Sequence, residues 1–403
     1  MRCIHHLKYI WSAFFFLEFG RYMYFIIISW ILYEMTNDAL YTGALVSVGF
    51  IPSLLINLLF GVIVDRFNRR KLTFYASLIS AMTVLIIWIL ILNEWLTPIS
   101  IILSHMIIQL MGSLFRPAIQ ALVAEIFDQK NLPRVFSQSG SAAIIGGLLG
   151  ASCGGLIVGV TSAFTATSIV FTSFLLTSFA VQLIKENSTN DNRNLVKNNI
   201  RTDLADGFVY LRNNLFLLEL FSVMFVGQLV FHTSIAFLSV YVNEYLEKSV
   251  SVYGFLDASI SIGGVIAGML GARWWNLNKR YLSINSLLVI ASGLLLVGLS
   301  PYLVSVFLGA MLIGLGTTWI RVLLQSVQQI ATDKAYHGRM ASYRMICNQG
   351  SVVISAPILG WVANTYGANM VYVTLLLPVG VAILFSVRQQ KNKKFIAITE
   401  ESV

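Results

Sequence analysis

Charged side chains are scarce in this chain of 403 residues, of which Asp, Glu, Lys and Arg together make up 11%. An ordinary soluble domain carries about 25%. Hydrophobic residues make up 57% of the chain, and the mean hydropathy is +0.77. This composition excludes a soluble globular enzyme, whose surface needs charge, and a disordered chain, which has few apolar residues.

Cysteine is rare as well, and the three that are present (Cys3, Cys153 and Cys347) lie far apart without a C-x-x-C pair. We therefore expect neither a disulfide framework nor a metal site. The nucleotide pattern G-x-x-x-x-G-K-[ST] and the zinc-protease pattern H-E-x-x-H do not occur in the sequence. We predict a protein that is not an enzyme, has no cofactor and draws its energy from an ion gradient, with protons first, or from a substrate gradient.

Long apolar runs fill most of the chain. A helix needs roughly 20 apolar residues to cross a bilayer, and runs of this length end at charged residues or at clusters of Gly, Pro and Asn. They predict an all-α integral membrane protein with twelve spanning helices, at 10–33, 39–64, 72–92, 99–123, 136–159, 163–184, 215–240, 250–272, 281–299, 302–325, 340–363 and 369–387.

The 27 basic residues are distributed unevenly between the two sides that this topology defines. Most lie in the N-terminus, the even-numbered loops and the tail, whereas the opposite side has only Lys248 among several carboxylates. Because basic loops stay in the cytoplasm, we expect a multi-pass protein of the cell membrane with both termini cytoplasmic. The net charge of +9 then needs no nucleic acid. The expected partners are membrane lipid and a small-molecule substrate, and we expect a monomer.

The longest polar stretch, 185–214, divides the chain into two halves. We predict a six-helix bundle at 1–184, a cytoplasmic linker with a short amphipathic helix at 185–214, a second six-helix bundle at 215–387 and a cytoplasmic tail at 388–403. A shift of 205 residues aligns polar residues of the two halves, although shared basic patterning offers a simpler explanation. Related halves are typical of secondary transporters. The aligned pairs are Arg116 with Arg321, Gln120 with Gln325, Asp128 with Asp333 and Arg134 with Arg339.

The loop after the second predicted helix contains the residues Gly61, Asp65, Arg66, Arg69, Arg70 and Lys71 in the pattern G-x-x-x-D-R-x-x-R-R-K. Glycine lets helices approach closely, the carboxylate suits a helix terminus or an arginine, and the basic residues favour the cytoplasmic side. The pattern resembles the loop signature of the major facilitator superfamily. The resemblance implies two pseudo-symmetric six-helix bundles, with this loop acting as a cytoplasmic gate.

The fifth predicted helix has a glycine stripe, formed by Gly146, Gly150, Gly154 and Gly155. It resembles the exporter motif G-x-x-x-G-P-x-x-G-G of that superfamily, except that Ala151 replaces the proline. The stripe indicates close helix contact that allows sliding, and ordinary small-residue packing is the alternative.

Further patches, among them 115–118, 131–134, 204–212 and 253–255, resemble the branch that contains macrolide-efflux proteins and enterobactin exporters. The resemblance implies export of a small organic molecule, a drug or antibiotic such as a macrolide, by proton antiport with alternating access. A siderophore is the alternative substrate. A nutrient importer and a sensor derived from a transporter are the other classes that remain open.

Charged residues within predicted helices are functional candidates, because a charge in a bilayer is costly unless it is paired or hydrated. Glu18 lies in the middle of the first helix, where it can bind a proton or a cationic substrate. Arg21 is three residues away on the same face, so a structural ion pair is the alternative. Asp257 is a second candidate for a proton or the substrate, with a hydrated surface position as the alternative. Asn57 and Gln109 are polar residues in the middle of helices, where they can face the cavity.

Arg116 and Arg321 occupy equivalent positions in the repeat, near one end of their helices. We predict that they belong to the gate and pair with Asp65 or Asp333, with binding of an anionic substrate as the alternative. Arg344 is predicted to bind Asp65 across the two halves.

Overall fold

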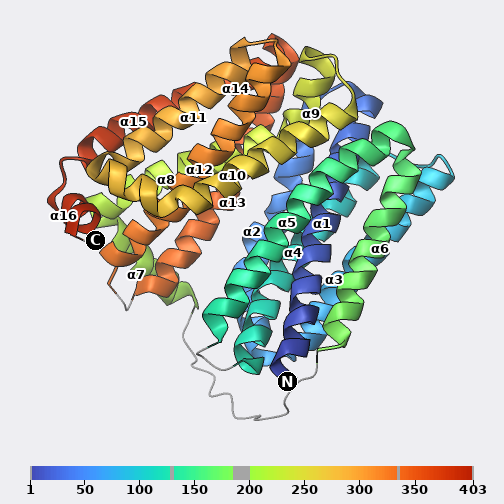
Figure 1. Ribbon diagram of the computed structural model, residues 1–403, viewed down its shortest axis with the longest axis horizontal. Coiled ribbons are helices and arrows are strands. Elements are labelled where there is room, and N and C mark those ends of the chain that lie inside the picture. Colours follow the sequence, from blue (N-terminus) through green and yellow to red (C-terminus); the bar gives the residue numbers. More distant parts are fainter. Residues whose placement is uncertain (1, 128–130, 185–199, 334–335, 402–403) are drawn as a thin grey trace. The chain divides into compact units, whose positions relative to one another are not determined.

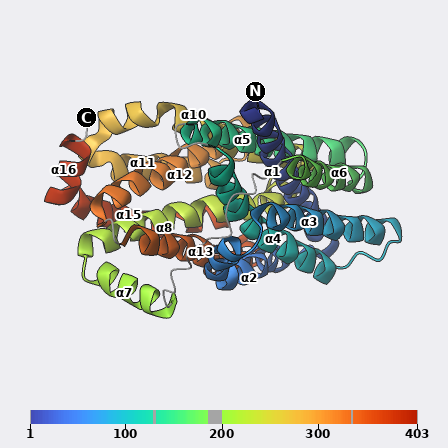
Figure 2. The ribbon, with the colours of Figure 1, turned by 90° about the horizontal axis from the view of Figure 1, so that it is seen from below.

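The computed structural model describes residues 2–127, 131–184, 200–333 and 336–401, and almost all of them lie in helices. The side chains of a few further residues, among them Asn57, Gly61 and Asp65, are outside the described part. In a bilayer a helix satisfies its own backbone hydrogen bonds, so apolar runs of this length are expected to be helical. Figures 1 and 2 show these helices from two directions.

The first half of the chain forms six long helices. They are α1 (Arg2–Thr36), α2 (Ala39–Arg66), α3 (Arg69–Leu92), α4 (Pro98–Ile126), α5 (Leu132–Val160) and α6 (Ala163–Gln182).

Polar residues at helix starts set the short connections of this half. The carboxylate of Asp38 accepts a hydrogen bond from the Leu40 amide at 2.8 Å, at the start of α2. The side chain of Asn68 accepts one from the Lys71 amide at 2.8 Å, at the start of α3. Each cap satisfies an amide that has no partner within its own helix. Asn68, a residue of the basic loop, therefore caps the N-terminus of α3, and the sequence pattern did not reveal this role.

The second half begins with a short helix and contains more breaks than the first. Its elements are α7 (Ile200–Arg212), α8 (Leu215–Ala236), α9 (Leu238–Val240), the π-helical turn η1 (Tyr241–Tyr245), α10 (Val250–Asn278), the 3₁₀ turn η2 (Lys279–Tyr281), α11 (Leu282–Leu299), α12 (Leu303–Ala331), α13 (His337–Tyr366), α14 (Met370–Thr374), α15 (Leu376–Gln389) and α16 (Lys393–Glu401).

The chain divides into two compact units. The first comprises Met1–Asn194 with Val242–Ala258, and the second comprises Leu195–Tyr241 with Ser259–Val403. The segment Val242–Ala258 thus packs with the first six helices, although it follows α8 in the chain. The division predicted from the polar stretch at 185–214 assigned this segment to the second half of the chain.

The two units repeat the same helix pairs. In the first unit α1 packs against α4, α5 and α6, and α3 packs against α4 and α6. In the second unit α8 packs against α12, α13 and α15, and α11 packs against α12 and α15. These are the pairs that a repeat of six helices would equate, so the packing agrees with the internal repeat read from the sequence.

Eleven stretches of the described chain are long and apolar enough to cross a bilayer. One of them, Val250–Leu299, has 50 residues and contains both α10 and α11. The predicted pattern of twelve spans corresponds to this set when that stretch is counted as two. Two details differ from the prediction: α1 begins at Arg2 rather than at residue 10, and the last span breaks at Leu375.

The linker and the tail also contain helices. The predicted amphipathic helix corresponds to α7, whereas 185–199 lie outside the described residues. The tail contains α16, which the sequence analysis did not predict. Its Phe395 is fully buried and lies edge-on to Phe216 of α8, with ring centroids 6.2 Å apart. One buried aromatic side chain on a nine-residue helix is a weak sequence signal, which explains the omission.

Candidate functional site

A cluster of charged and polar side chains lies inside the first unit, between α1 and α4. Glu18 of α1 accepts a hydrogen bond from Arg116 Nη2 to its Oε1 at 2.7 Å. Arg21 Nη1 donates to Glu18 Oε2 at 3.2 Å, and Arg21 Nη2 donates to Gln109 Oε1 at 2.9 Å. Three of the predicted candidates, Glu18, Arg21 and Gln109, therefore meet in one network.

The carboxylate of Glu18 is enclosed, since its side chain is only 5% exposed. Burying a charge in an apolar medium costs several kcal/mol unless it is paired, and the two guanidinium groups supply that pairing. Of the alternatives left open for Glu18, the contacts favour the ion pair.

The cluster has more positive than negative charge, because two arginines share one carboxylate. The Arg116 side chain is 55% exposed, against 21% for Arg21. A guanidinium on a membrane helix avoids lipid and turns to water or to a polar ligand. Arg116 thus presents an accessible cation on an otherwise buried network.

Gly112 of α4 makes room for the Arg21 side chain. A Cβ atom at this position would lie 3.4 Å from Nε and 3.5 Å from Cζ of Arg21. The Nε atom is buried and has no hydrogen-bond partner among the described residues. The guanidinium therefore lies against the backbone of α4, where Gln109 holds its other end.

Arg116, which was predicted to pair with an acid of the gate such as Asp65 or Asp333, forms an ion pair with Glu18. It lies well inside α4, at the level of the carboxylate on α1. The side chain of Asp65 is outside the described part, so the predicted gate pairing stays a prediction. The carboxylate of Asp333 instead accepts a hydrogen bond from the Tyr210 hydroxyl at 3.2 Å, within the second unit.

Arg321, the counterpart of Arg116 in the repeat, has a different environment. Its guanidinium carbon lies 5.2 Å from the centre of the Phe231 ring on α8, a cation–π distance. The helix pair is equivalent to that of Arg116, since α12 and α8 correspond to α4 and α1. The contact described for Arg321 differs from that of Arg116, because its guanidinium lies over an aromatic ring.

The basic loop binds within the first unit. Arg69 Nη1 forms an ion pair with Glu125 Oε2 of α4 at 3.0 Å, and it also donates to the Ala121 carbonyl at 3.2 Å. Arg70 donates to the carbonyl of Gln182 at the end of α6. The remaining two basic residues of the pattern, Arg66 and Lys71, are exposed.

Three predicted roles fall on Asn57, Gly61 and Asp65, whose surroundings lie outside the described part. The predicted contact between Arg344 and Asp65 is therefore not described. Within the second unit Arg344 Nη1 donates to Gln328 Oε1 at 3.3 Å.

The glycine stripe of α5 contacts the backbone of α1. A Cβ atom at Gly146 would lie 3.2 Å from Phe15 Cα, one at Gly150 would lie 2.9 Å from Phe19 Cα, and one at Gly154 would lie 3.2 Å from Met23 Cα. Helices in lipid associate through such close packing, because lipid provides no hydrophobic force between them.

Gly155 faces a different neighbour from the rest of the stripe. Its Cβ would lie 2.9 Å from Gly254 Cα, on the segment Val242–Ala258. Glycine opposite glycine lets α5 and α10 touch through their backbones in the first unit. This contact helps to explain why that segment belongs to the first unit.

A row of polar side chains along one face of α1 was not recognised from the sequence. Beyond Glu18 it continues with Tyr22, Ser29 and Tyr33, at spacings that place all four on one helix face. Ser29 Oγ is 2.7 Å from the hydroxyl of Tyr253, and the Tyr33 hydroxyl donates to Glu244 Oε2 at 3.0 Å. Hydroxyl side chains that recur at helical spacing in an otherwise apolar helix are the sequence signal that would have revealed this row.

Asp257, the other predicted acidic candidate, is 1% exposed and lies four residues after Tyr253 on α10. Its Oδ1 atom is buried without a hydrogen-bond partner among the described residues. Tyr22 lies within range of the charges of both Glu18 and Asp257. The two carboxyl groups therefore belong to the same unit but have different surroundings.

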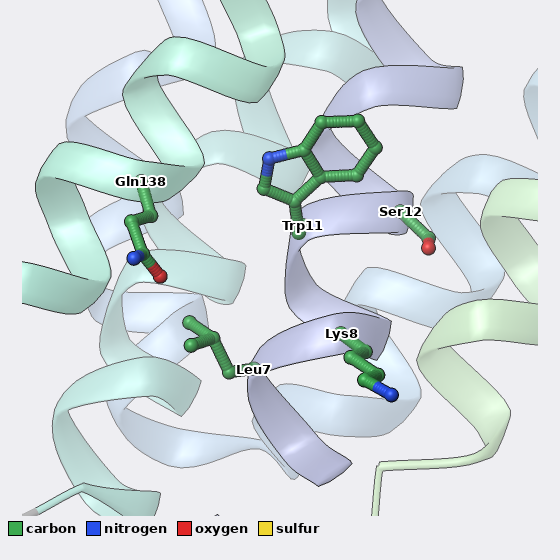
Figure 3. A pocket seen from close by; sticks show the side chains of 5 residues that line it. All are labelled: Leu7, Lys8, Trp11, Ser12 and Gln138. Atoms are coloured by element: carbon green, nitrogen blue, oxygen red, sulfur yellow. The ribbon is translucent and has the colours of Figure 1, made fainter. Parts of the chain in front are cut away.

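Figure 3 shows a pocket of about 390 Å³ near the start of α1. Leu7, Lys8, Trp11 and Ser12 of α1 and Gln138 of α5 line it. The Trp11 ring stacks on Phe15, with centroids 5.3 Å apart. The pocket is open and lacks the charged cluster, so it is separate from the Glu18 network.

Two helical units with repeated packing, membrane-length helices and a buried charged network define a multi-pass membrane transporter. The chain belongs to the Major Facilitator Superfamily, whose family model matches residues 10–356. This finding confirms the fold and the family that the loop motif predicted. It also agrees with the prediction of a transporter.

Among curated proteins the chain is similar to Macrolide efflux protein A of Streptococcus pyogenes, with 24% identity over 275 residues, which are 67% of each chain. It is 20% identical to the staphyloferrin A transporter of Staphylococcus aureus, over 89% of this chain and 90% of that one. A crystal structure of a mutant nucleoside transporter NupG matches 95% of this chain and 99% of the other, with a TM-score of 0.73 and 15% identity, and this likeness supports the fold alone. The similarity to Macrolide efflux protein A agrees with the efflux branch that the sequence indicated.

Proposed function

We propose that this transporter exports a small organic molecule from the cytoplasm in exchange for protons that enter the cell. The similarity to Macrolide efflux protein A supports the direction. The distribution of basic loops supports a chain in the cytoplasmic membrane with both termini in the cytoplasm. It works as a monomer with no cofactor other than the proton gradient.

The accessible guanidinium of Arg116 supports a substrate with an acidic group. The network around Glu18 has two cations and one anion, and its exposed member is a cation. A guanidinium binds a carboxylate through paired hydrogen bonds. A carboxylate-bearing chelator of the siderophore type fits this charge balance better than a cationic drug does. The substrate that was second in the sequence analysis therefore becomes the first candidate.

A macrolide or another basic drug is the second candidate. The similarity to macrolide efflux proteins favours it, and Asp257 is the acidic group that a protonated amine would approach. Its Oδ1 atom, which is buried and has no hydrogen-bond partner among the described residues, distinguishes it from Glu18.

Flux measurements in inverted membrane vesicles test this proposal. An acid-inside gradient should drive accumulation of a labelled carboxylate siderophore, whereas labelled erythromycin should accumulate less. Collapse of the gradient with a protonophore should abolish accumulation. Substitution Arg116→Gln should raise the KM for the siderophore, while Arg273→Gln, at an exposed arginine near the end of α10 and outside the network and the basic loop, serves as the matched control.

Two results would contradict the proposal in different ways. Substrate accumulation that does not depend on the pH gradient would exclude proton exchange. Accumulation of the macrolide with no flux of the siderophore would reverse the order of the two substrates.

A further inference from the structure

The two buried carboxyl groups of the first unit differ in how their charge is balanced. Glu18 accepts hydrogen bonds from the guanidinium groups of Arg116 and Arg21. Asp257 has no ion pair among the described residues, and its Oδ1 atom has no hydrogen-bond partner there. An ionised Asp257 would be an uncompensated charge, and a proton is the smallest ligand that neutralises it.

The titratable groups near Asp257 are phenols rather than cations. Tyr253 lies one turn earlier on the same helix, and Tyr22 of α1 lies within range of the charge of Asp257. From α5 the neighbouring turn of α10 meets the carbonyl of Ala151 and the backbone of Gly155. A phenol both donates and accepts hydrogen bonds, so these neighbours suit either protonation state of the carboxyl.

A series of hydroxyl groups leads from Asp257 toward the end of the unit. The Tyr253 hydroxyl is 2.7 Å from Ser29 Oγ, and both residues are fully buried. Tyr33 follows Ser29 by one turn of α1 and donates to Glu244 Oε2 at 3.0 Å. Glu244 is exposed and lies at the end of the unit that is expected to face the cell exterior.

We propose that Asp257 is the proton-carrying group of this transporter, and that the Tyr253–Ser29 and Tyr33–Glu244 pairs connect it to the outer surface. A proton from solvent passes along hydroxyl groups and intervening water to the Asp257 carboxylate, which becomes a neutral carboxylic acid. Release of the same proton toward the cytoplasm restores the carboxylate. The Glu18 network then binds substrate and does not carry the proton. This inference rests on the proposed proton exchange.

Infrared spectroscopy of the purified protein tests the protonation site without any substrate. The carbonyl stretch of a buried carboxylic acid should appear as the pH falls, and Asp257→Asn should remove it. Glu219→Gln, which changes a partly exposed carboxyl near the start of α8, is the matched control and should leave the band unchanged. A band that persists in Asp257→Asn and disappears in Glu18→Gln would overturn the assignment.

Reconstituted vesicles test coupling in a second way. With labelled siderophore, Asp257→Asn should lose accumulation driven by a pH gradient, down to the level of empty vesicles. It should keep exchange of labelled for unlabelled substrate at equal pH, which also shows that the variant is folded. Retained gradient-driven accumulation would overturn the proposal. If the wild type itself shows no proton-driven flux, the proposed function fails, and the infrared result still decides whether Asp257 takes up a proton.

The hydroxyl route has its own matched pair of variants. Tyr253→Phe should slow proton uptake by Asp257 several-fold in stopped-flow measurements and leave the final titration unchanged. Tyr24→Phe removes another buried tyrosine hydroxyl, 2.6 Å from a serine oxygen on α4, and should leave the rate unaffected. Equal rates in both variants would exclude this route.

Discussion

The close contact between α1 and α5 gives a quantitative prediction for the substitution Gly150→Ala. The new Cβ would lie 2.9 Å from Phe19 Cα and closer still to the Phe19 carbonyl oxygen, whereas an ordinary contact begins at 3.4 Å. The neighbour is backbone and cannot turn aside, so α1 must move away by about half an ångström or more. Overpacking of this kind costs about 1–3 kcal/mol.

The same substitution also has a favourable component, because alanine is a better helix former than glycine by about 1 kcal/mol. Gly140→Ala isolates this component. Gly140 lies on the same helix and is exposed, and a Cβ atom added there would meet no other atom within 4 Å. We therefore expect Gly140→Ala to be neutral or stabilising, and Gly150→Ala to be less stable than Gly140→Ala by about 1–3 kcal/mol.

Thermal unfolding in one detergent, followed by tryptophan fluorescence, measures the difference between the two variants. Vesicle transport should fall in Gly150→Ala and stay near the wild-type level in Gly140→Ala. Equal stability of the two variants would refute the reasoning, since it would mean that α1 and α5 do not touch through their backbones at this point.

Three further changes are expected to have measurable effects. In a double-mutant cycle of Glu18→Gln and Arg116→Gln, the losses in substrate affinity should be non-additive by about 0.5–3 kcal/mol, and additive losses would exclude the pair. Burial raises the pKa of the Tyr210 phenol, so its bond to Asp333 should be complete below the ordinary tyrosine pKa of about 10 and lost as the pH rises through the higher pKa of the folded protein. The stability advantage of the wild type over Tyr210→Phe should shrink accordingly in thermal unfolding at increasing pH. Arg69→Ala breaks a partly exposed ion pair and should lower stability by less than about 1 kcal/mol, as measured by unfolding in detergent.

The helices were predictable because the bilayer imposes one physical requirement on every span. A run of apolar residues must be long enough to cross the membrane and must satisfy its own backbone, and both conditions can be read from the sequence. Their ends depend on caps such as Asn68 and on local breaks such as Leu375. Because a cap or a break depends on a single residue, the predicted ends of the helices were less accurate than the prediction that the helices exist.

The candidate site was only half predictable, because its contacts combine local and distant residues. Glu18 and Arg21 are three apart on one helix, so their proximity follows from helical geometry alone. Arg116 is 98 positions from Glu18, and only the packing of α4 on α1 determines that they meet. The hydroxyl partners of Ser29 and Tyr33 depend in the same way on where Val242–Ala258 packs.

The internal repeat predicted which helices pack together, but it did not predict which side chains the aligned arginines contact. Both arginines of the aligned pair reach the first helix of their own half, but Arg116 meets a carboxylate and Arg321 an aromatic ring. A common backbone arrangement fixes which helices touch, whereas the facing side chain can change without disturbing the helix pair. Among the described residues, the buried ion pairs and the unpartnered carboxyl of Asp257 all belong to the first unit. The two halves therefore share a packing scheme of their helices and differ in the side chains that face the aligned arginines.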